Sequence, residues 1–160
     1  NKRFPKDKCN TKYLTSFPPH KKLEVHPVED NQLLYIAICS IHAYQSSFVI
    51  YSQFTEVPYG NIPDPKGLVF SRYQEGKMVG GNHWIIDPEY NPKTKVLTTR
   101  SKGRGIGDCG EKAVYQWKNK NGGSFDMLKY WSKEECDGDI ESEWPIVWEK
   151  EPTKKEKSAE

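Results

Sequence analysis

The sequence contains no long apolar run, and its positive and negative charges almost cancel. No segment approaches the roughly 20 consecutive apolar residues of a membrane-spanning helix, so we expect no membrane span. The 24 Lys and Arg residues against 22 Asp and Glu residues leave a formal net charge of +2. Because proteins bind nucleic acid largely through its phosphate charge, this balance argues against nucleic acid as a partner.

The sequence also lacks the ligand spacings that are typical of metal and cofactor sites. Its four cysteines form no CxxC pair, and its four histidines form no HxxxH pair. Zinc sites usually need such closely spaced ligands. The acidic run over 134–143 does not follow the spacing of an EF-hand calcium loop. We therefore expect neither a metal ion nor a cofactor.

The cysteines are Cys9, Cys39, Cys109 and Cys136. An even number spread along a small polar domain is typical of disulfide bonds, which persist in oxidising compartments. We therefore predict a periplasmic or secreted protein. The first ten residues, NKRFPKDKCN, have no apolar signal-peptide core, and removal of a signal peptide would explain this.

The length of 160 residues fits a single domain with its own core. Four prolines in residues 1–31 oppose helix formation and predict an extended N-terminal arm, pinned to the domain through Cys9. Residues 32–148 form the predicted β-rich domain. Residues 149–160 contain mainly Lys and Glu, so we expect a flexible charged tail.

Short segments rich in β-branched and aromatic residues predict a mostly β, antiparallel single domain with long loops. Residues 33–54 are the most apolar part and fit two strands of a hairpin. A short buried helix over 33–43 is the alternative, because periodicity cannot assign a continuous apolar run. The content of Ile, Tyr and Val favours strands. Further strands are expected at 68–73, 83–87, 96–101 and 144–148, with loops at 56–67 and 74–82.

A second hairpin is predicted at 112–118 and 124–130, around the turn sequence NKNGG. If Lys118 faces Ser124, two of the cysteines lie near the same open end of this hairpin. A disulfide needs Cα atoms roughly 4.4 to 6.8 Å apart, which this register could meet. The predicted bonds are Cys109–Cys136 and, by elimination, Cys9–Cys39.

A glycine run surrounds Arg104 and Asp108. Glycine reaches positive φ and close chain approach without steric cost, so we predict a shaped corner between two strands. Arg104 could hold a phosphate or carboxylate among backbone N–H groups, but the run lacks the GK[ST] ending of a phosphate loop. The favoured interpretation is that Arg104 pairs with Asp108 and braces the corner. The glycines are Gly103, Gly105, Gly107 and Gly110.

Five tryptophans permit a binding function, because aromatic side chains anchor protein interfaces and stack on sugars. Core packing accounts for about three of them, since aliphatic residues are few. The candidates for an exposed contact surface are Trp131 and the proline-rich loop at 56–67 with Tyr59.

Residues 91–148 run NPKTKVLTTRSKGRGIGDCG, then YQW, GSFDML, CDG and WPIVW. This order resembles the bacterial domain of unknown function 1176 family, with KGRGIGDCG at 102–110 and Cys39 followed by Ala43-Tyr44-Gln45. The family pattern has six cysteines and this chain has four. The resemblance implies secretion and a β-rich, disulfide-bonded fold, and it carries over no catalytic residue.

We predict a non-enzymatic protein that binds another envelope or secreted protein, in the manner of an inhibitor or immunity protein. The alternative is a module that binds cell-wall glycan through exposed tryptophans. A third hypothesis is a thiol-dependent hydrolase that uses Cys109, with His42 or His83 as the base. No helix is predicted to follow Cys109 and lower the pKa of its thiol, so a disulfide role is favoured.

Overall fold

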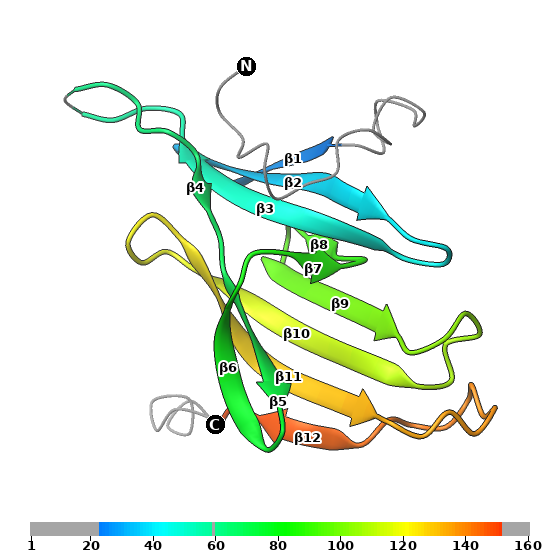
Figure 1. Cartoon of the computed structure of the whole chain (residues 1–160). Helices are drawn as coiled ribbons and strands as arrows, with labels where there is room; N and C mark the ends of the chain where they lie inside the picture. Colours follow the sequence, from blue (N-terminus) through cyan, green and yellow to red (C-terminus); the bar gives the residue numbers. More distant parts are fainter. Residues whose placement is uncertain (1–22, 59, 152–160) are drawn as a thin grey trace.

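The computed structural model describes residues 23–58 and 60–151 of the chain. All regular secondary structure in this part is β-strand, and every strand pairing is antiparallel. The predicted fold class is therefore confirmed (Figure 1). None of these residues belongs to a helix that could cross a membrane.

The first sheet is built on the hairpin that the sequence predicts at 33–54. It has the order β1-β2-β3-β4, and β7 pairs with another part of β3. Along the second strand of this sheet, buried Leu34 and Ile36 alternate with partly exposed neighbours. This period of two is that of a strand, so the alternative helix is wrong. The strands are β1 (Leu23–Glu29), β2 (Gln32–Ile41), β3 (Ser46–Phe54), β4 (Lys66–Gly67) and β7 (Ile85–Ile86).

Part of the predicted N-terminal arm belongs to this sheet. Strand β1 pairs with β2 along its length and carries Pro27, and the register shifts between Pro27 and Glu29. An edge strand tolerates proline because one side of it needs no hydrogen-bond donors. Residues 1–22, including Cys9, lie outside the described residues.

The second sheet has the order β12-β11-β10-β9-β8. Its centre is the predicted hairpin of β10 and β11, and Lys118 faces Ser124 as expected. The last strand includes Glu149, where the sequence predicts the tail to begin. The strands are β8 (Glu89–Asn91), β9 (Val96–Lys102), β10 (Gly110–Lys118), β11 (Ser124–Lys133) and β12 (Ile146–Glu149).

A third hairpin, β5 (Phe70–Gln74) with β6 (Lys77–Asn82), replaces the loop that the sequence predicts at 74–82. Glu75 and Gly76 make its turn, both with positive φ, as a two-residue hairpin turn requires. The sequence did not indicate β6 because Gly80 and Gly81 interrupt its pattern of alternation. Strand β5 packs against β11, and the hairpin crosses in front of the second sheet in Figure 1.

The core joins residues of both sheets and of β5. Strand β7 belongs to the first sheet and β8 to the second, so the chain passes from one sheet to the other between them. One buried cluster contains residues of both sheets. Aromatic rings fill much of this space, with the Trp117 and Phe125 ring centres 5.3 Å apart. The buried cluster is Val28, Leu34, Ile36, Ile50, Leu68, Phe70, Ile85, Leu97, Ala113, Tyr115, Trp117, Phe125, Met127 and Tyr130.

Candidate functional site

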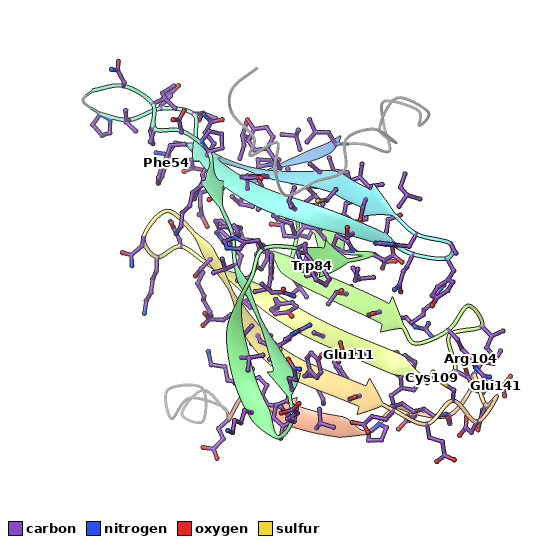
Figure 2. The ribbon with its side chains drawn as sticks, in the orientation of Figure 1. Phe54, Trp84, Arg104, Cys109, Glu111 and Glu141 are labelled. Carbon is purple, nitrogen blue, oxygen red and sulfur yellow. A yellow bond between two sulfur atoms is a disulfide. The ribbon has the colours of Figure 1, made fainter. Side chains whose placement is uncertain are left out.

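The predicted disulfide closes the glycine corner. Cys109 and Cys136 are bonded, with Cα atoms 4.9 Å apart, so this prediction is confirmed. The bond ties the segment after β11 to the start of β10, at the right-hand end of the second sheet in Figure 2. The predicted Cys9–Cys39 bond stays a prediction, because Cys9 lies outside the described residues.

Arg104 and Asp108 form an ion pair inside this corner, as the sequence predicts. The Asp108 carboxylate is fully buried. Arg104 Nε donates to Asp108 Oδ1 at 2.8 Å, and Arg104 Nη2 donates to Oδ2. Gly138 N also donates to Oδ2 at 2.7 Å, and Arg104 Nη2 donates to the Cys136 carbonyl at 3.1 Å. The Asp108 side chain is buried and that of Arg104 is 48% exposed, and their contacts join the glycine corner to the segment around Cys136.

The same contacts hold the pKa of Asp108 well below its usual range. The hydrogen bond from Arg104 is the largest cause, and the Gly138 N–H adds to it against the opposing effect of burial. A carboxyl group with a lowered pKa stabilises the fold fully above its ordinary pKa of about 4. This contribution declines as the pH falls toward the lowered pKa.

We therefore expect the substitution Asp108→Asn to remove an acid-sensitive part of the stability. The Tm of the variant should lie well below that of the wild type at pH 7, and the difference should shrink between about pH 5 and pH 2. Thermal unfolding followed by circular dichroism across this range measures it. A difference that stays constant with pH would contradict an ionised Asp108.

Cys109 does not offer a thiol in this structure. It is 1% exposed and joined to Cys136, and none of the described cysteines is free. A nucleophilic cysteine must be an accessible thiolate. The hypothesis of a hydrolase built on Cys109 therefore fails for the oxidised protein.

A broad hollow lies on the face of the second sheet that points away from the core. Along β10, Ala113 and Tyr115 are buried in the core, whereas Lys112 and Val114 line this hollow. Its volume is about 690 Å³. We call it the outer hollow. It is lined by Asp87, Glu89, Thr98, Thr99, Arg100, Lys112, Ala113, Val114, Lys129, Trp131, Glu143, Trp144 and Ile146.

Two tryptophans shape the outer hollow. Trp131, predicted as a contact residue, lies on β11 and is half-buried, with Lys129 Nζ 5.4 Å from its ring centre. Trp144, just before β12, is buried. The other predicted contact residue, Tyr59, lies outside the described residues. Of the predicted candidates that the structure describes, only Trp131 lines the hollow.

Arg100 and Lys112 carry unneutralised positive charge in the outer hollow. They face each other across β9 and β10, and both lie on the Trp144 ring, at 5.2 Å and 4.1 Å from its centre. Neither forms an ion pair with any described residue. Burial, and then the charge of Arg100, lower the pKa of Lys112.

Sequence reasoning missed these two cations and Trp144. The strand alternation of β10 places Lys112 on the face opposite Tyr115, and that signal was available. What was missing was the register across the glycine corner, which alone places Arg100 opposite Lys112.

Comparisons with known proteins give a family but no activity. A family model described as "Protein of unknown function (DUF1176)" matches residues 2–151. The uncharacterized protein YpfG of Escherichia coli (strain K12) is 24% identical over 132 residues, which are 82% of this chain and 36% of that protein. The chain thus spans little more than a third of the length of this curated relative. No solved structure matches the chain.

Proposed function

The chain belongs to the DUF1176 family of proteins of unknown function, and from that premise we propose that it is a non-enzymatic binding module that holds an acidic segment of another protein in its outer hollow. We place both partners in the envelope of a bacterium or outside the cell. The disulfide Cys109–Cys136 supports this compartment, since such bonds persist where the surroundings are oxidising.

The observation that carries the proposal is the pair of Arg100 and Lys112 on the Trp144 ring. Like charges that face each other across two strands destabilise a sheet. Partial burial in the hollow adds a desolvation cost for Lys112. A carboxylate from a partner would offset both costs through charge-assisted hydrogen bonds. An arrangement that is costly in the free protein thereby becomes favourable in a complex.

The rest of the outer hollow favours an acidic peptide over a dense polyanion. Asp87, Glu89 and Glu143 also line it, and they would repel a ligand that carries a charge on every unit. A peptide segment presents carboxylates one at a time, with apolar groups between them. Trp131 and Ile146 offer apolar surface for those neighbours.

We expect the double substitution R100Q/K112Q to weaken binding of an acidic peptide by at least tenfold. Loss of one charge-assisted contact of about 1.4 kcal/mol corresponds to that factor. The measurement is calorimetric titration of the full chain with a Glu-containing peptide and with the same peptide carrying Gln instead. Wild-type affinity should fall as salt is added, because exposed charges are screened.

The matched control is Lys118→Gln, which removes an exposed positive charge at the far end of β10. Its affinity should stay close to that of the wild type. The double substitution removes a like-charge repulsion but also the Arg100 hydrogen bond to the Gly107 carbonyl at 2.8 Å and two contacts with the Trp144 ring. Thermal unfolding of R100Q/K112Q is therefore measured beside the titration, and a cooperative transition above the titration temperature separates lost binding from lost folding. Equal affinity for the Glu and Gln peptides would rule the proposal out.

A further inference from the structure

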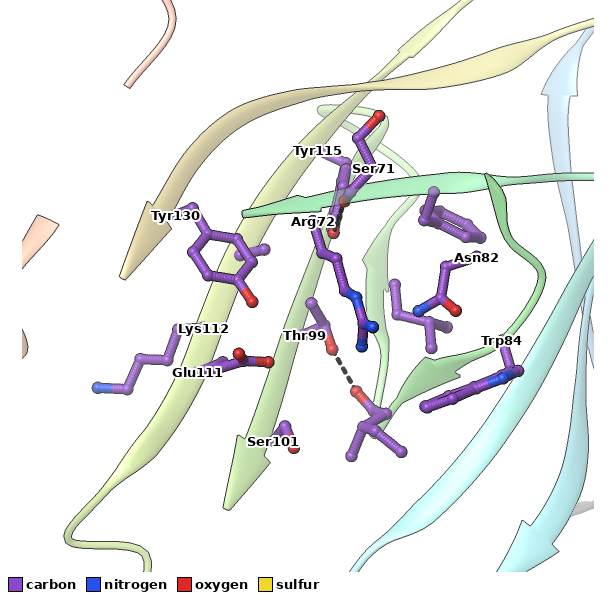
Figure 3. Close-up of a pocket in the computed structure, with 14 residues that line it drawn as sticks. Ser71, Arg72, Asn82, Trp84, Thr99, Ser101, Glu111, Lys112, Tyr115 and Tyr130 are labelled. Carbon is purple, nitrogen blue, oxygen red and sulfur yellow. Dashed lines mark hydrogen bonds between the residues drawn. The ribbon is translucent and has the colours of Figure 1, made fainter. Parts of the chain in front are cut away.

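A second cavity lies on the opposite face of the second sheet, where the β5–β6 hairpin crosses it (Figure 3). We call it the inner cavity. Its volume is about 120 Å³, room for about four waters at roughly 30 Å³ each. Its lining includes the partly exposed ring of Trp84. The polar and aromatic side chains that line it include Arg72, Asn82, Trp84, Ser101, Glu111 and Tyr130.

Several polar groups of the inner cavity have unused hydrogen-bonding capacity. The side chains of Asn82 and Ser101 form no hydrogen bond with any described residue. Arg72 donates only to Gln74 Oε1, at 3.1 Å. Glu111 forms no ion pair within the described residues, although Arg72 lines the same cavity, and it accepts a hydrogen bond from the Tyr130 hydroxyl. Asn82, Ser101 and Arg72 thus offer unused donors or acceptors to a guest, and the Glu111 carboxylate has lone pairs beyond the one that Tyr130 occupies.

Tyr130 completes the polar side of the inner cavity. Figure 3 shows its hydroxyl group directed toward Glu111. Burial, and then the Glu111 carboxylate, raise the pKa of Tyr130 above its ordinary value. The hydroxyl therefore keeps its proton at neutral pH, donates its hydrogen bond to Glu111 and holds that carboxylate at the cavity wall.

Trp84 supplies an apolar surface at the mouth. It lies between β6 and β7 and is 45% exposed, although a large aromatic ring usually lies inside a fold. Figure 3 shows the indole at the edge of the cavity, beside Asn82. A flat aromatic face next to planar polar side chains can hold a ligand that has both an apolar face and hydroxyl groups on its edge.

The charges of the inner cavity decide which ligand fits. An anion would meet Glu111, and a cation would meet Arg72. A purely apolar ligand would leave these polar groups desolvated without partners, which is costly. A neutral molecule with several hydroxyl groups avoids both penalties.

We propose that the inner cavity binds one neutral sugar residue, which stacks on Trp84 and places its hydroxyl groups against Asn82, Arg72 and Glu111. The cavity admits only the edge of the ring, in place of a few waters, while the face of the ring covers the exposed indole. This site is separate from the outer hollow, and it does not depend on the binding of an acidic peptide.

The test is a titration of the full chain, followed by tryptophan fluorescence and calorimetry, with neutral oligosaccharides of glucose, galactose, mannose and N-acetylglucosamine. A uronic-acid oligosaccharide serves as the charged comparison. At least one neutral sugar should bind saturably. The substitutions Trp84→Ala and Asn82→Ala should each weaken it at least tenfold, whereas Trp131→Ala, on the other face of the sheet, should leave it unchanged.

Three results would overturn the proposal: no saturable binding by any neutral sugar, an undiminished affinity of the Trp84→Ala variant, or tighter binding of the uronic-acid sugar. Circular dichroism checks that the variants fold. The acidic peptide should bind the Trp84→Ala variant as it binds the wild type. Failure at the inner cavity can therefore be told apart from failure at the outer hollow.

Discussion

Replacement of Gly110 by alanine is expected to lower the free energy of unfolding by about 4 kcal/mol or more, a loss that only severe steric or backbone changes produce. Gly110 has a φ of 132°, and an added Cβ would lie 2.1 Å from the Ser101 carbonyl oxygen and 2.9 Å from Gly103 N. Both neighbours are backbone atoms. A side chain could rotate away, but Ser101 belongs to the paired part of β9, and Gly103 N donates to the Cys109 carbonyl at 2.9 Å.

Gly105→Ala is the matched control in the same corner. An added Cβ there would meet the Tyr44 ring at 3.7 Å, an ordinary contact, and Gly105 has no positive φ. Urea unfolding of both variants measures the difference. We expect Gly105→Ala to change the stability by less than about 1 kcal/mol. A Gly110→Ala protein as stable as the wild type would contradict the close approach of the Ser101 carbonyl and Gly103 N to Gly110.

Removal of the disulfide by the double substitution C109A/C136A should cost about 3.5 kcal/mol. The bond joins residues 27 apart in sequence, and the loss of closure entropy in an unfolded loop of that size is of this order. Urea unfolding without reductant is the measurement, so that only this bond differs between the two proteins. A loss below about 1 kcal/mol would mean that the ordered contacts of the corner suffice to hold it.

The disulfide and Asp108 should act together. Arg104 reaches the Cys136 carbonyl, and Asp108 accepts a hydrogen bond from Gly138 N, so both contacts depend on the segment that the bond holds. Residues that share partners have non-additive effects. The triple variant C109A/D108N/C136A should therefore lose less stability than the sum of the disulfide and Asp108→Asn losses. If the loss of the triple variant equals the sum of the two separate losses, the disulfide and Asp108 stabilise the fold independently.

The elements predicted correctly from the sequence are those whose signals are local. The hairpin of β2 and β3 follows from an apolar stretch with a polar break, and that of β10 and β11 follows from the NKNGG turn. The turn sets the register of Lys118 against Ser124, and this register brings Cys109 and Cys136 together. The pairing of Arg104 with Asp108 is similarly local, since the two lie four residues apart within one glycine-rich loop.

The elements that the sequence did not predict are held by neighbours distant in the chain. Strand β1 depends on its pairing with β2, and β6 depends on β5, which in turn packs on β11. Prolines and glycines weaken the local preference of these segments. Their extended conformation is stabilised by tertiary contacts, which no short window of sequence contains.

The sequence by itself determined the β class of this protein, its two long hairpins and the disulfide corner, because alternation and turn chemistry act over a few residues. Only the tertiary structure decided the two candidate binding sites. Arg100, Lys112 and Trp144 meet on one face of the second sheet, and Trp84 and Glu111 line a cavity on the other. These contacts depend on the register between strands and on the position of the β5–β6 hairpin across the second sheet. Both are determined by the packing of the whole core, which no short segment of sequence contains.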